Sequence, residues 1–193
     1  MANSKFYEYG VAKLIVADYN GDGTYGEPVE ISGLMSVNIT FSQKETYYSA
    51  DNDPKYLTTQ APTTAEGTIK IIGLPIEDYN KFFNTVTDNK GGVIIGDDVP
   101  VKHIGISYVT SSADEDSTDQ IKFTMFDCTA TLPAETSESS TTDDVKVKDV
   151  SIAVSASRIY ANGHYMTASK ISKSAAGADW STIENQIYVP EVV

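Results

Sequence analysis

A strict alternation of apolar and polar residues is the feature that most limits how this chain can fold. The apolar residues Met35, Val37, Ile39 and Phe41 are each separated by one polar residue. Successive side chains of a β-strand point to opposite faces, so this spacing predicts a strand with one buried face. Further strands are predicted at residues 9–18, from 29 onward, and at 68–73, 101–110, 120–132 and 145–157. The chain is therefore predicted to be mainly β.

One long segment between these strands lacks the pattern. Residues 42–66 are rich in threonine and proline and show no apolar periodicity, which predicts a long extended loop. Loops longer than ~15 residues are uncommon in compact domains and are usually functional. Tyr47, Tyr48 and Tyr56 lie in this loop, where aromatic side chains need some cover. Two interpretations stay open: the tyrosines fold back onto their own sheet, or they contact a partner surface.

One helix is predicted after the strand at residues 68–73. Ile76, Tyr79, Phe83 and Val86 fall at helical spacings and would share one face. Pro75 suits the first helical position because its missing N–H is not needed there. The spacing thus predicts a single helix packed on the sheet.

Two late strands change the parity of their apolar residues. In 145–157 the parity changes near Lys148 or Asp149, and a bulge there would restore one buried face. In 120–132 the apolar set moves from Phe123 and Met125 to Phe126 and Cys128, which predicts a strand that is either bulged or covered on both sides.

The C-terminal region from residue 161 has a weaker pattern. Trp180 is its most prominent apolar residue. A terminal segment with one tryptophan docks either on its own domain or on a neighbour.

Composition and charge exclude several classes of protein. The 193 residues suit one domain, and 40 % hydrophobic residues is a globular composition. The formal net charge is −13, and Arg158 is the single arginine, which argues against nucleic-acid binding through phosphate contacts. Cys128 is the single cysteine, so an intramolecular disulfide is excluded. No run resembles a signal peptide or a membrane span, and we expect a protein made and kept in the cytoplasm.

The best formal match to a known chemical motif is a partial calcium loop. Asp18, Asn20 and Asp22 place oxygen ligands at alternate positions before Gly23. The twelfth position, which should supply a bidentate glutamate, is Val29. A hairpin turn rich in Asp, Asn and Gly explains the same residues and is the favoured interpretation.

No constellation of residues predicts an enzyme. His103 and His164 are isolated, and Cys128 lies in an apolar strand where a thiol is unreactive. Nucleophile elbows, phosphate-binding loops and zinc-binding helices of known pattern do not occur. We expect neither catalysis nor a cofactor.

Several short segments occur in an order that resembles a known family. They are residues 23–28 (Gly-Thr-Tyr-Gly-Glu-Pro), 48–52 (Tyr-Ser-Ala-Asp-Asn), 66–68 (Glu-Gly-Thr), 74–75 (Leu-Pro) and 128–133 (Cys-Thr-Ala-Thr-Leu-Pro). Each is a turn or a strand edge, and it is their joint order that is specific. The chain resembles the major tail proteins, or tail-tube subunits, of long-tailed, non-contractile phages and related prophages of Gram-positive hosts.

This resemblance implies a single domain over residues 1–193. The implied fold is a β-sandwich or barrel with one flanking helix, an inter-subunit loop at 42–66 and a C-terminal arm at 158–193. Six copies would form a ring, and stacked rings would form a tube that conducts DNA without binding it. The implied contacts between subunits are Tyr47, Tyr48, Asp51, Asn52, Tyr56 and Trp180.

The resemblance also implies partners and a location. A tape-measure protein and a tail terminator would contact the tube, which is assembled in the host cytoplasm and resides in the virion tail. An immunoglobulin-like domain that some members carry after the tube domain is not matched, and neither is the acidic insert at residues 114–119.

Two alternatives remain. A calcium-dependent carbohydrate-binding β-sandwich would use Tyr47, Tyr48 and Tyr56 as a stacking platform. Its metal loop would be formed by Asp18, Asn20 and Asp22. A neck, terminator or baseplate protein would share the fold of the tube subunit.

Overall fold

The computed structural model describes residues 7–96, 100–113, 118–135 and 147–191. Within these ranges the chain is mainly β, as the alternation predicts. The main sheet has nine strands: β1 (Tyr7–Gly21), β2 (Thr24–Tyr25), β3 (Val29–Ile31), β4 (Leu34–Ser42), β7 (Thr64–Ile72), β10 (Ile104–Ala113), β11 (Thr118–Thr131), β12 (Asp149–Ser157) and β15 (Ala168–Ser172).

Three hairpins and two short helical segments complete the described chain. The hairpins pair β5 (Glu45–Ala50) with β6 (Asp53–Gln60), β8 (Val86–Thr87) with β9 (Val93–Ile94), and β13 (Ile159–Ala161) with β14 (His164–Met166). The helical segments are η1 (Ile76–Asp78), which continues directly into α1 (Tyr79–Phe82), and α2 (Trp180–Ile183). No helix in the described part of the chain is both long and apolar enough to span a membrane.

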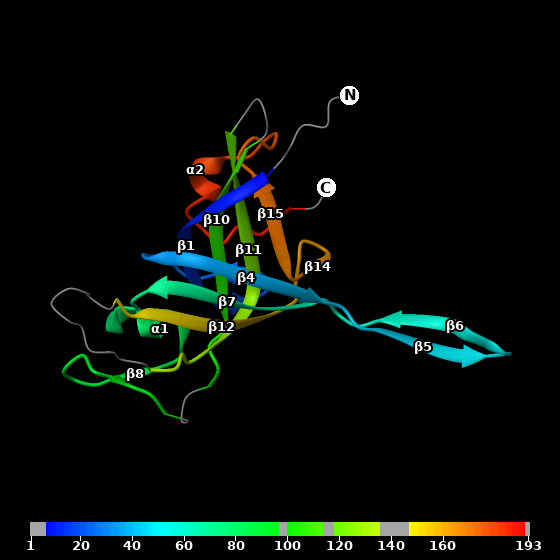
Figure 1. Cartoon of the computed structure of the whole chain (residues 1–193), viewed down its shortest axis with the longest axis horizontal. Coiled ribbons are helices and arrows are strands. Elements are labelled where there is room, and N and C mark those ends of the chain that lie inside the picture. The colour runs from blue at the N-terminus through cyan, green and yellow to red at the C-terminus, as the bar shows by residue number, and fades with distance from the viewer. Residues whose placement is uncertain (1–6, 97–99, 114–117, 136–146, 192–193) are drawn as a thin grey trace.

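The main sheet is antiparallel, and one run of chain, β3 followed by β4, pairs with strands near both ends of the sheet. Its order is β2-β1-β10-β11-β12-β7-β4, with β3 on β1 and β15 on β11. Strands β3 and β4 are separated only by Ser32 and Gly33, so the same run of chain pairs with β1 and then with β7. In Figure 1, β4, β7 and β12 lie side by side and cross the layer formed by β10, β11 and β15.

The core lies between these two layers. It combines side chains from β1, β3, β7, β10, β11 and β12 with two phenylalanines from the α1 region, and the fully buried ones include Leu14, Ile69, Ile71, Phe82, Ile104, Ile106, Cys128 and Ile152. Burying each large aliphatic side chain contributes roughly 1.5–3 kcal/mol. The body of the molecule is therefore held by contacts between strands distant in sequence.

The alternating strand is confirmed, but two of its four apolar residues are largely exposed. Val37 and Ile39 pack against the core from β4, whereas Met35 and Phe41 are 45 % and 49 % exposed. The pairing of β4 with β7 shifts register between Leu34 and Ser36, so Met35 lies in a bulge. The bulge turns Met35 away from the core face.

The expected bulge near Lys148 and Asp149 is wrong. Strand β12 begins at Asp149 and alternates regularly between exposed and buried residues, with no register shift against β7 or β11. Val147 precedes the strand and is exposed, and Val145 lies outside the described residues. The change of parity thus marks the start of a strand.

Strand β11 is both bulged and covered on both sides. Its register against β10 shifts between the pairs Ile104–Cys128 and Ile106–Met125. Met125 and Cys128 face the main core, whereas Phe126 between them packs in a second cluster around Ile15. Strand β11 pairs with β15 before this point and with β12 after it, so the bulge lies where the strand changes partners.

The expected helix is much shorter than its spacing suggests. Residues Ile76–Asp78 form a 3₁₀ turn and Tyr79–Phe82 one α-helical turn, after which Phe83 is extended. Phe82 and Phe83 are both buried although the helix ends between them, because Phe83 is extended with φ of −120° and ψ of 147°. Val86 lies in β8 and is exposed.

Candidate functional site

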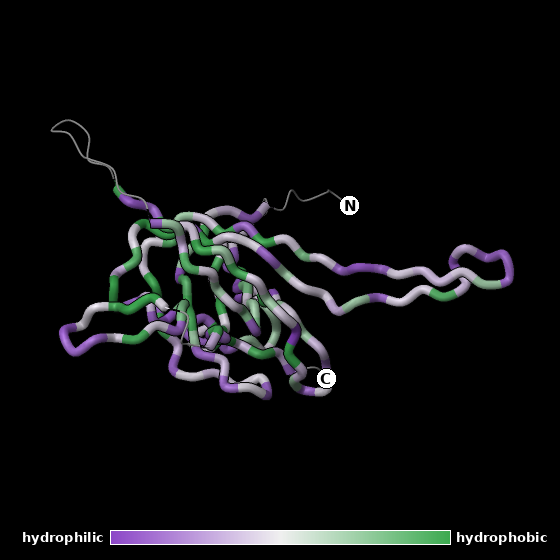
Figure 2. The backbone as a smooth tube through the Cα atoms, turned by 90° about the horizontal axis from the view of Figure 1, so that it is seen from below, coloured by the Kyte–Doolittle hydropathy of each residue, from purple (hydrophilic) through white to green (hydrophobic). Residues whose placement is uncertain are grey.

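The segment expected to be a loop is a free-standing hairpin, which we call the arm (β5 and β6). Its strands of 6 and 8 residues pair only with each other, and every residue in them is exposed. Figure 1 shows the arm extending away from the body, and Figure 2 shows its hydrophilic tip. At ~3.3 Å per residue an eight-residue strand reaches about 26 Å. The segment between β4 and β7 is thus a paired hairpin, where the sequence predicts a long extended loop over residues 42–66.

The arm carries large apolar side chains that its own chain does not cover. Tyr47, Tyr48, Tyr56 and Leu57 are 44 %, 54 %, 62 % and 53 % exposed. Tyr48 and Leu57 are direct cross-strand partners and form an apolar pair on one face. Of the two interpretations, folding back onto the main sheet is therefore excluded for the three tyrosines. Contact with a partner stays a prediction.

The opposite face of the arm carries a polar network. The Tyr47 hydroxyl donates to Glu45 Oε2 at 2.6 Å, and Gln60 Nε2 donates to Glu45 Oε1 at 3.0 Å. These two hydrogen bonds lower the pKa of Glu45, and the same contact raises the pKa of Tyr47. Lys55 Nζ lies 4.4 Å from the centre of the Tyr47 ring. The arm thus has one face with the Tyr48–Leu57 pair, which we call its apolar face, and a polar face on which the Tyr47 ring lies within this network.

A two-residue turn closes the arm. Asp51 and Asn52 have φ values of 50° and 63°, the left-handed conformation that Asp and Asn tolerate better than other non-glycine residues. Two consecutive residues of this kind form the type I′ turn that suits hairpins. The Asp53 carboxylate accepts a hydrogen bond from the Lys55 N–H at 2.9 Å. Asp51 and Asn52, expected to contact a neighbouring subunit, therefore form the tip of the arm.

The base of the arm is fixed to the body. Phe41 at the end of β4 lies 6.2 Å from Phe123, whose ring is 5.2 Å from Tyr108. Burial raises the pKa of Tyr108 to about 12. On the other side, the Thr167 hydroxyl donates to the Thr63 carbonyl at 2.9 Å. These contacts give the arm a defined direction.

Trp180 docks on its own chain. It begins α2, is 8 % exposed and packs in a cluster with Val109 and Ile183. Little of the ring remains for the predicted contact with a neighbour. The described part of the predicted C-terminal arm, residues 158–191, lies against the body as β13, β14, β15 and α2.

The partial calcium loop is a hairpin turn. Asp18 belongs to β1 and its Oδ1 pairs with Lys102 Nζ at 2.8 Å. Asp22 is at the tip of a turn between β1 and β2, with a φ of 52°, and Asn20 lies between them in β1. No group of three or more His, Cys, Asp or Glu suited to a metal is found among the residues that the structure describes.

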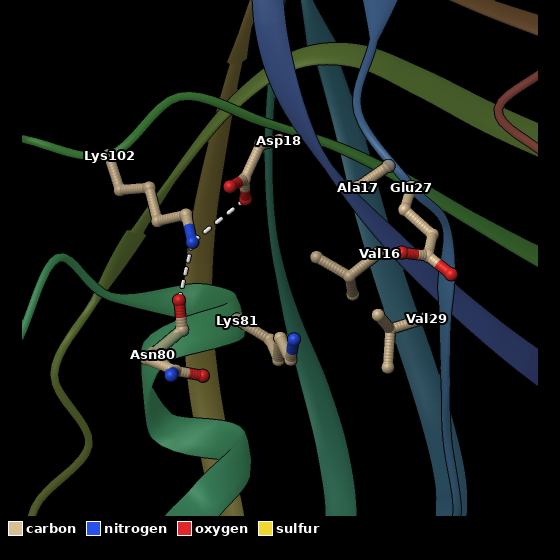
Figure 3. A pocket seen from close by; sticks show the side chains of 8 residues that line it. All are labelled: Val16, Ala17, Asp18, Glu27, Val29, Asn80, Lys81 and Lys102. Carbon is tan, nitrogen blue, oxygen red and sulfur yellow. Dashed lines mark hydrogen bonds and ion pairs between the residues drawn. The ribbon is translucent and has the colours of Figure 1, made fainter.

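The same Lys102 lies at a small surface pocket of about 250 Å³. Figure 3 shows its ammonium group between the Asp18 carboxylate and the main-chain carbonyl of Asn80, to which it also donates. Glu27 and Lys81 line the rest of the rim. The charged groups partly neutralise each other, and the contacts serve to join α1 to β1.

Several titratable groups lie in or near the sheet. Burial raises the pKa of the Cys128 thiol, which makes it unreactive. Lys122 is 1 % exposed, its ammonium donates to the Glu184 carbonyl at 3.1 Å, and burial lowers its pKa to about 8. His103 Nδ1 lies 2.6 Å from Asp127 Oδ1 on a half-exposed edge. Cys128, Lys122 and the His103–Asp127 pair are structural contacts in this arrangement.

Sequence reasoning identified the tyrosines of the arm but missed Leu57 and Lys55. The signal that would have found them is the two-residue Asp51–Asn52 turn, flanked on both sides by residues that favour strands. Recognising this hairpin would have paired Tyr48 with Leu57. No protein-family model and no curated protein sequence matches this chain.

Proposed function

We propose that this protein is the structural subunit of a phage tail tube, which assembles into stacked hexameric rings around a channel for DNA. The observation that carries the proposal is the arm: a hairpin with exposed tyrosines and leucine that its own body does not cover. An isolated two-stranded hairpin is at best marginally stable in water. A second molecule that covers the apolar face would supply the missing burial.

A second exposed apolar region supports an assembly in which unlike surfaces of two copies contact each other. Ile76, Val86, Ile94 and Ile95, near α1 and the β8–β9 hairpin, are each about half exposed. Figure 1 shows this region on the side of the body away from the arm. Contacts between unlike surfaces produce rings when the rotation closes and filaments when it does not. A stacked tube uses both kinds of contact.

The charge of the chain supports a channel for DNA. Six copies with a net charge of −13 would carry 6 × −13 = −78 charges. Duplex DNA has one negative charge per ~1.7 Å of its axis, so an acidic wall would repel it and allow it to slide. In this proposal the protein needs no catalysis and no cofactor. Its partners are further copies, a tape-measure protein and a tail terminator, and its location is the virion tail.

Negative-stain electron microscopy of the purified protein over a concentration series tests the proposal. We expect six-fold rings or tubes of uniform width above a threshold concentration. Chains that remain monomeric at every concentration would overturn the proposal. Rings that never elongate would instead favour the neck or terminator alternative.

A matched pair of variants connects the assembly to the arm. Leu57→Ser removes apolar surface from the exposed pair with Tyr48, and we expect it to prevent tube formation without altering the fold. Thr58→Ser, at the neighbouring position on the polar face, is the control and should assemble normally. Equal assembly of both variants would show that the apolar face of the arm is not a contact.

A further inference from the structure

The outer face of the β13–β14 hairpin carries a small positively charged aromatic surface. Tyr160 and Tyr165 are cross-strand partners with ring centres 4.9 Å apart. The Arg158 guanidinium carbon lies 4.1 Å from the centre of the Tyr165 ring. All three side chains are exposed, and Tyr160 and Tyr165 are 58 % and 64 % exposed. We call these three residues the arginine surface.

The arginine surface is arranged to bind a carboxylate. Within the described ranges, no acidic side chain forms an ion pair with Arg158. A guanidinium that stacks on a ring through its face keeps its N–H groups at the edge, where they match the two oxygens of a carboxylate. The stacking also limits the motion of the side chain, so less conformational entropy is lost on binding.

The turn of the arm has the complementary charge. Asp51 is exposed at the tip, and no hydrogen bond or ion pair between described residues involves its carboxylate. Asp53 adds a second acidic group beside it, although one of its oxygens already binds the Lys55 N–H. Figure 1 shows β14 near the base of the arm and the tip pointing away from the body. The tip of a chain therefore does not reach its own arginine surface.

We propose that the arginine surface of one copy binds the arm tip of a second copy, through Arg158 and Asp51. This inference rests on the proposed function, because it names the surface that receives the arm in the assembly. The contact joins two different surfaces, so each copy offers one tip and one receiving surface. Every copy in an assembly could therefore form the contact twice.

Charge reversal tests the contact directly. The variants Asp51→Lys and Arg158→Glu each place like charges opposite each other, which is costly at an interface. For each variant alone we expect the threshold concentration for assembly, measured by sedimentation, to rise about tenfold or more. In an equimolar mixture each mutant tip meets a mutant surface of opposite charge, and each normal tip meets a normal surface. We expect the mixture to assemble near the wild-type threshold.

The control variant is Asp22→Lys. Asp22 is also exposed, also lies in a two-residue turn, and has a φ of 52° against 50° for Asp51. Asp22→Lys therefore reproduces the change in charge and the turn strain without altering the arm, and it should assemble like the wild type. Circular dichroism and thermal unfolding of each variant confirm that the fold is retained.

The outcomes separate the two proposals. Single variants that assemble like the wild type, or a mixture that fails to restore assembly, would overturn the contact while leaving the tube subunit intact. Restoration by mixing would support the contact, because only a contact between different copies can produce it. Wild-type protein that never assembles would overturn the proposed function and this inference together.

Discussion

The arm and the paired strands β7 and β12 use the same antiparallel hydrogen bonds but differ in what covers their faces. In β12, residues alternate regularly between exposed and buried, and the buried set includes Ile152 with no exposed surface. In β5 and β6 every residue is exposed. The ladder of hydrogen bonds therefore orders a strand, while burial of one face supplies most of its stability.

This difference separates a region that covers its own apolar side chains from one that leaves them exposed. The body encloses its own core between two crossing layers. The arm has the cross-strand pairs of a sheet but no second layer. If a second copy supplies that layer, truncating an apolar side chain should lower the stability of the fold when the side chain lies in the body. It should weaken assembly when the side chain lies in the arm.

Truncating one apolar side chain in each region should give the largest contrast. Ile152→Ala leaves a cavity in the core, and we expect the free energy of unfolding to fall by about 2–5 kcal/mol. Leu57→Ala, at a position that is 53 % exposed, should change it by less than about 0.5 kcal/mol. Urea unfolding of the unassembled protein, followed by circular dichroism, measures both. Similar losses for the two variants would contradict the comparison.

Lys122 should make the stability of the body depend on pH in a way that no arm residue does. Its pKa is about 8 in the folded chain and ~10.4 when unfolded, so between these values the unfolded state binds more protons. The contribution of Lys122 to the free energy of unfolding should therefore rise with pH, by about 2 kcal/mol between about pH 7.5 and about pH 9.5. The buried Cys128 thiol opposes this rise, because its pKa is raised in the folded chain and it ionises near pH ~8.5 when unfolded, which lowers the free energy of unfolding by about 1 kcal/mol over the same range.

Two variants test whether Lys122 causes this pH dependence of stability. Lys122→Met removes the buried ammonium group, so its free energy of unfolding should fall over this range through Cys128 alone, whereas Lys55→Met on the exposed arm should follow the wild type. Urea unfolding at the two pH values measures the effect. A rise that persists in Lys122→Met would mean that another group causes it.

The backbones of β4 and β7 approach each other so closely at Gly67 that a side chain there should destabilise the fold. A Cβ at Gly67 would lie 2.1 Å from the Asn38 carbonyl oxygen in the neighbouring strand, so β4 and β7 would have to separate. We expect Gly67→Ala to lower the free energy of unfolding by about 1–3 kcal/mol. Gly96→Ala, where a Cβ meets no atom within 4 Å, is the matched control. Thermal unfolding of both variants provides the measurement, and a neutral Gly67→Ala would show that the two strands separate easily.

The body could be predicted from sequence largely because its strands bury one face. The alternation in β4 and β12 reflects that burial, and the change of parity in β11 correctly indicated its bulge and its double cover. The helix was overestimated because Tyr79 and Phe83 keep a helical spacing although the backbone becomes extended at Phe83. Burial between layers therefore leaves a readable pattern, whereas the residue at which a short helix ends does not.

The arm could be predicted only in part for the same reason. A strand with no buried face is under no selection for alternating apolar residues, so residues 45–60 show no alternation, and only the Asp51–Asn52 turn indicates a hairpin there. The tyrosines still indicated that something must cover them. The arginine surface was missed because it is formed by cross-strand pairing around the Asn162–Gly163 turn, a signal that is independent of periodicity.

The turn of the arm offers the smallest but most local test of the comparison. Asn52 has a φ of 63°, which glycine adopts freely and β-branched residues adopt at a cost. Asn52→Gly should preserve the arm, and Asn52→Val should destabilise it by about 1 kcal/mol while leaving the body unchanged. Hydrogen exchange of the unassembled protein should show faster exchange in β5 and β6 for Asn52→Val alone. Slower exchange of these same amides on assembly would identify the second copy as the layer that the arm lacks, and unchanged exchange would place the contact elsewhere.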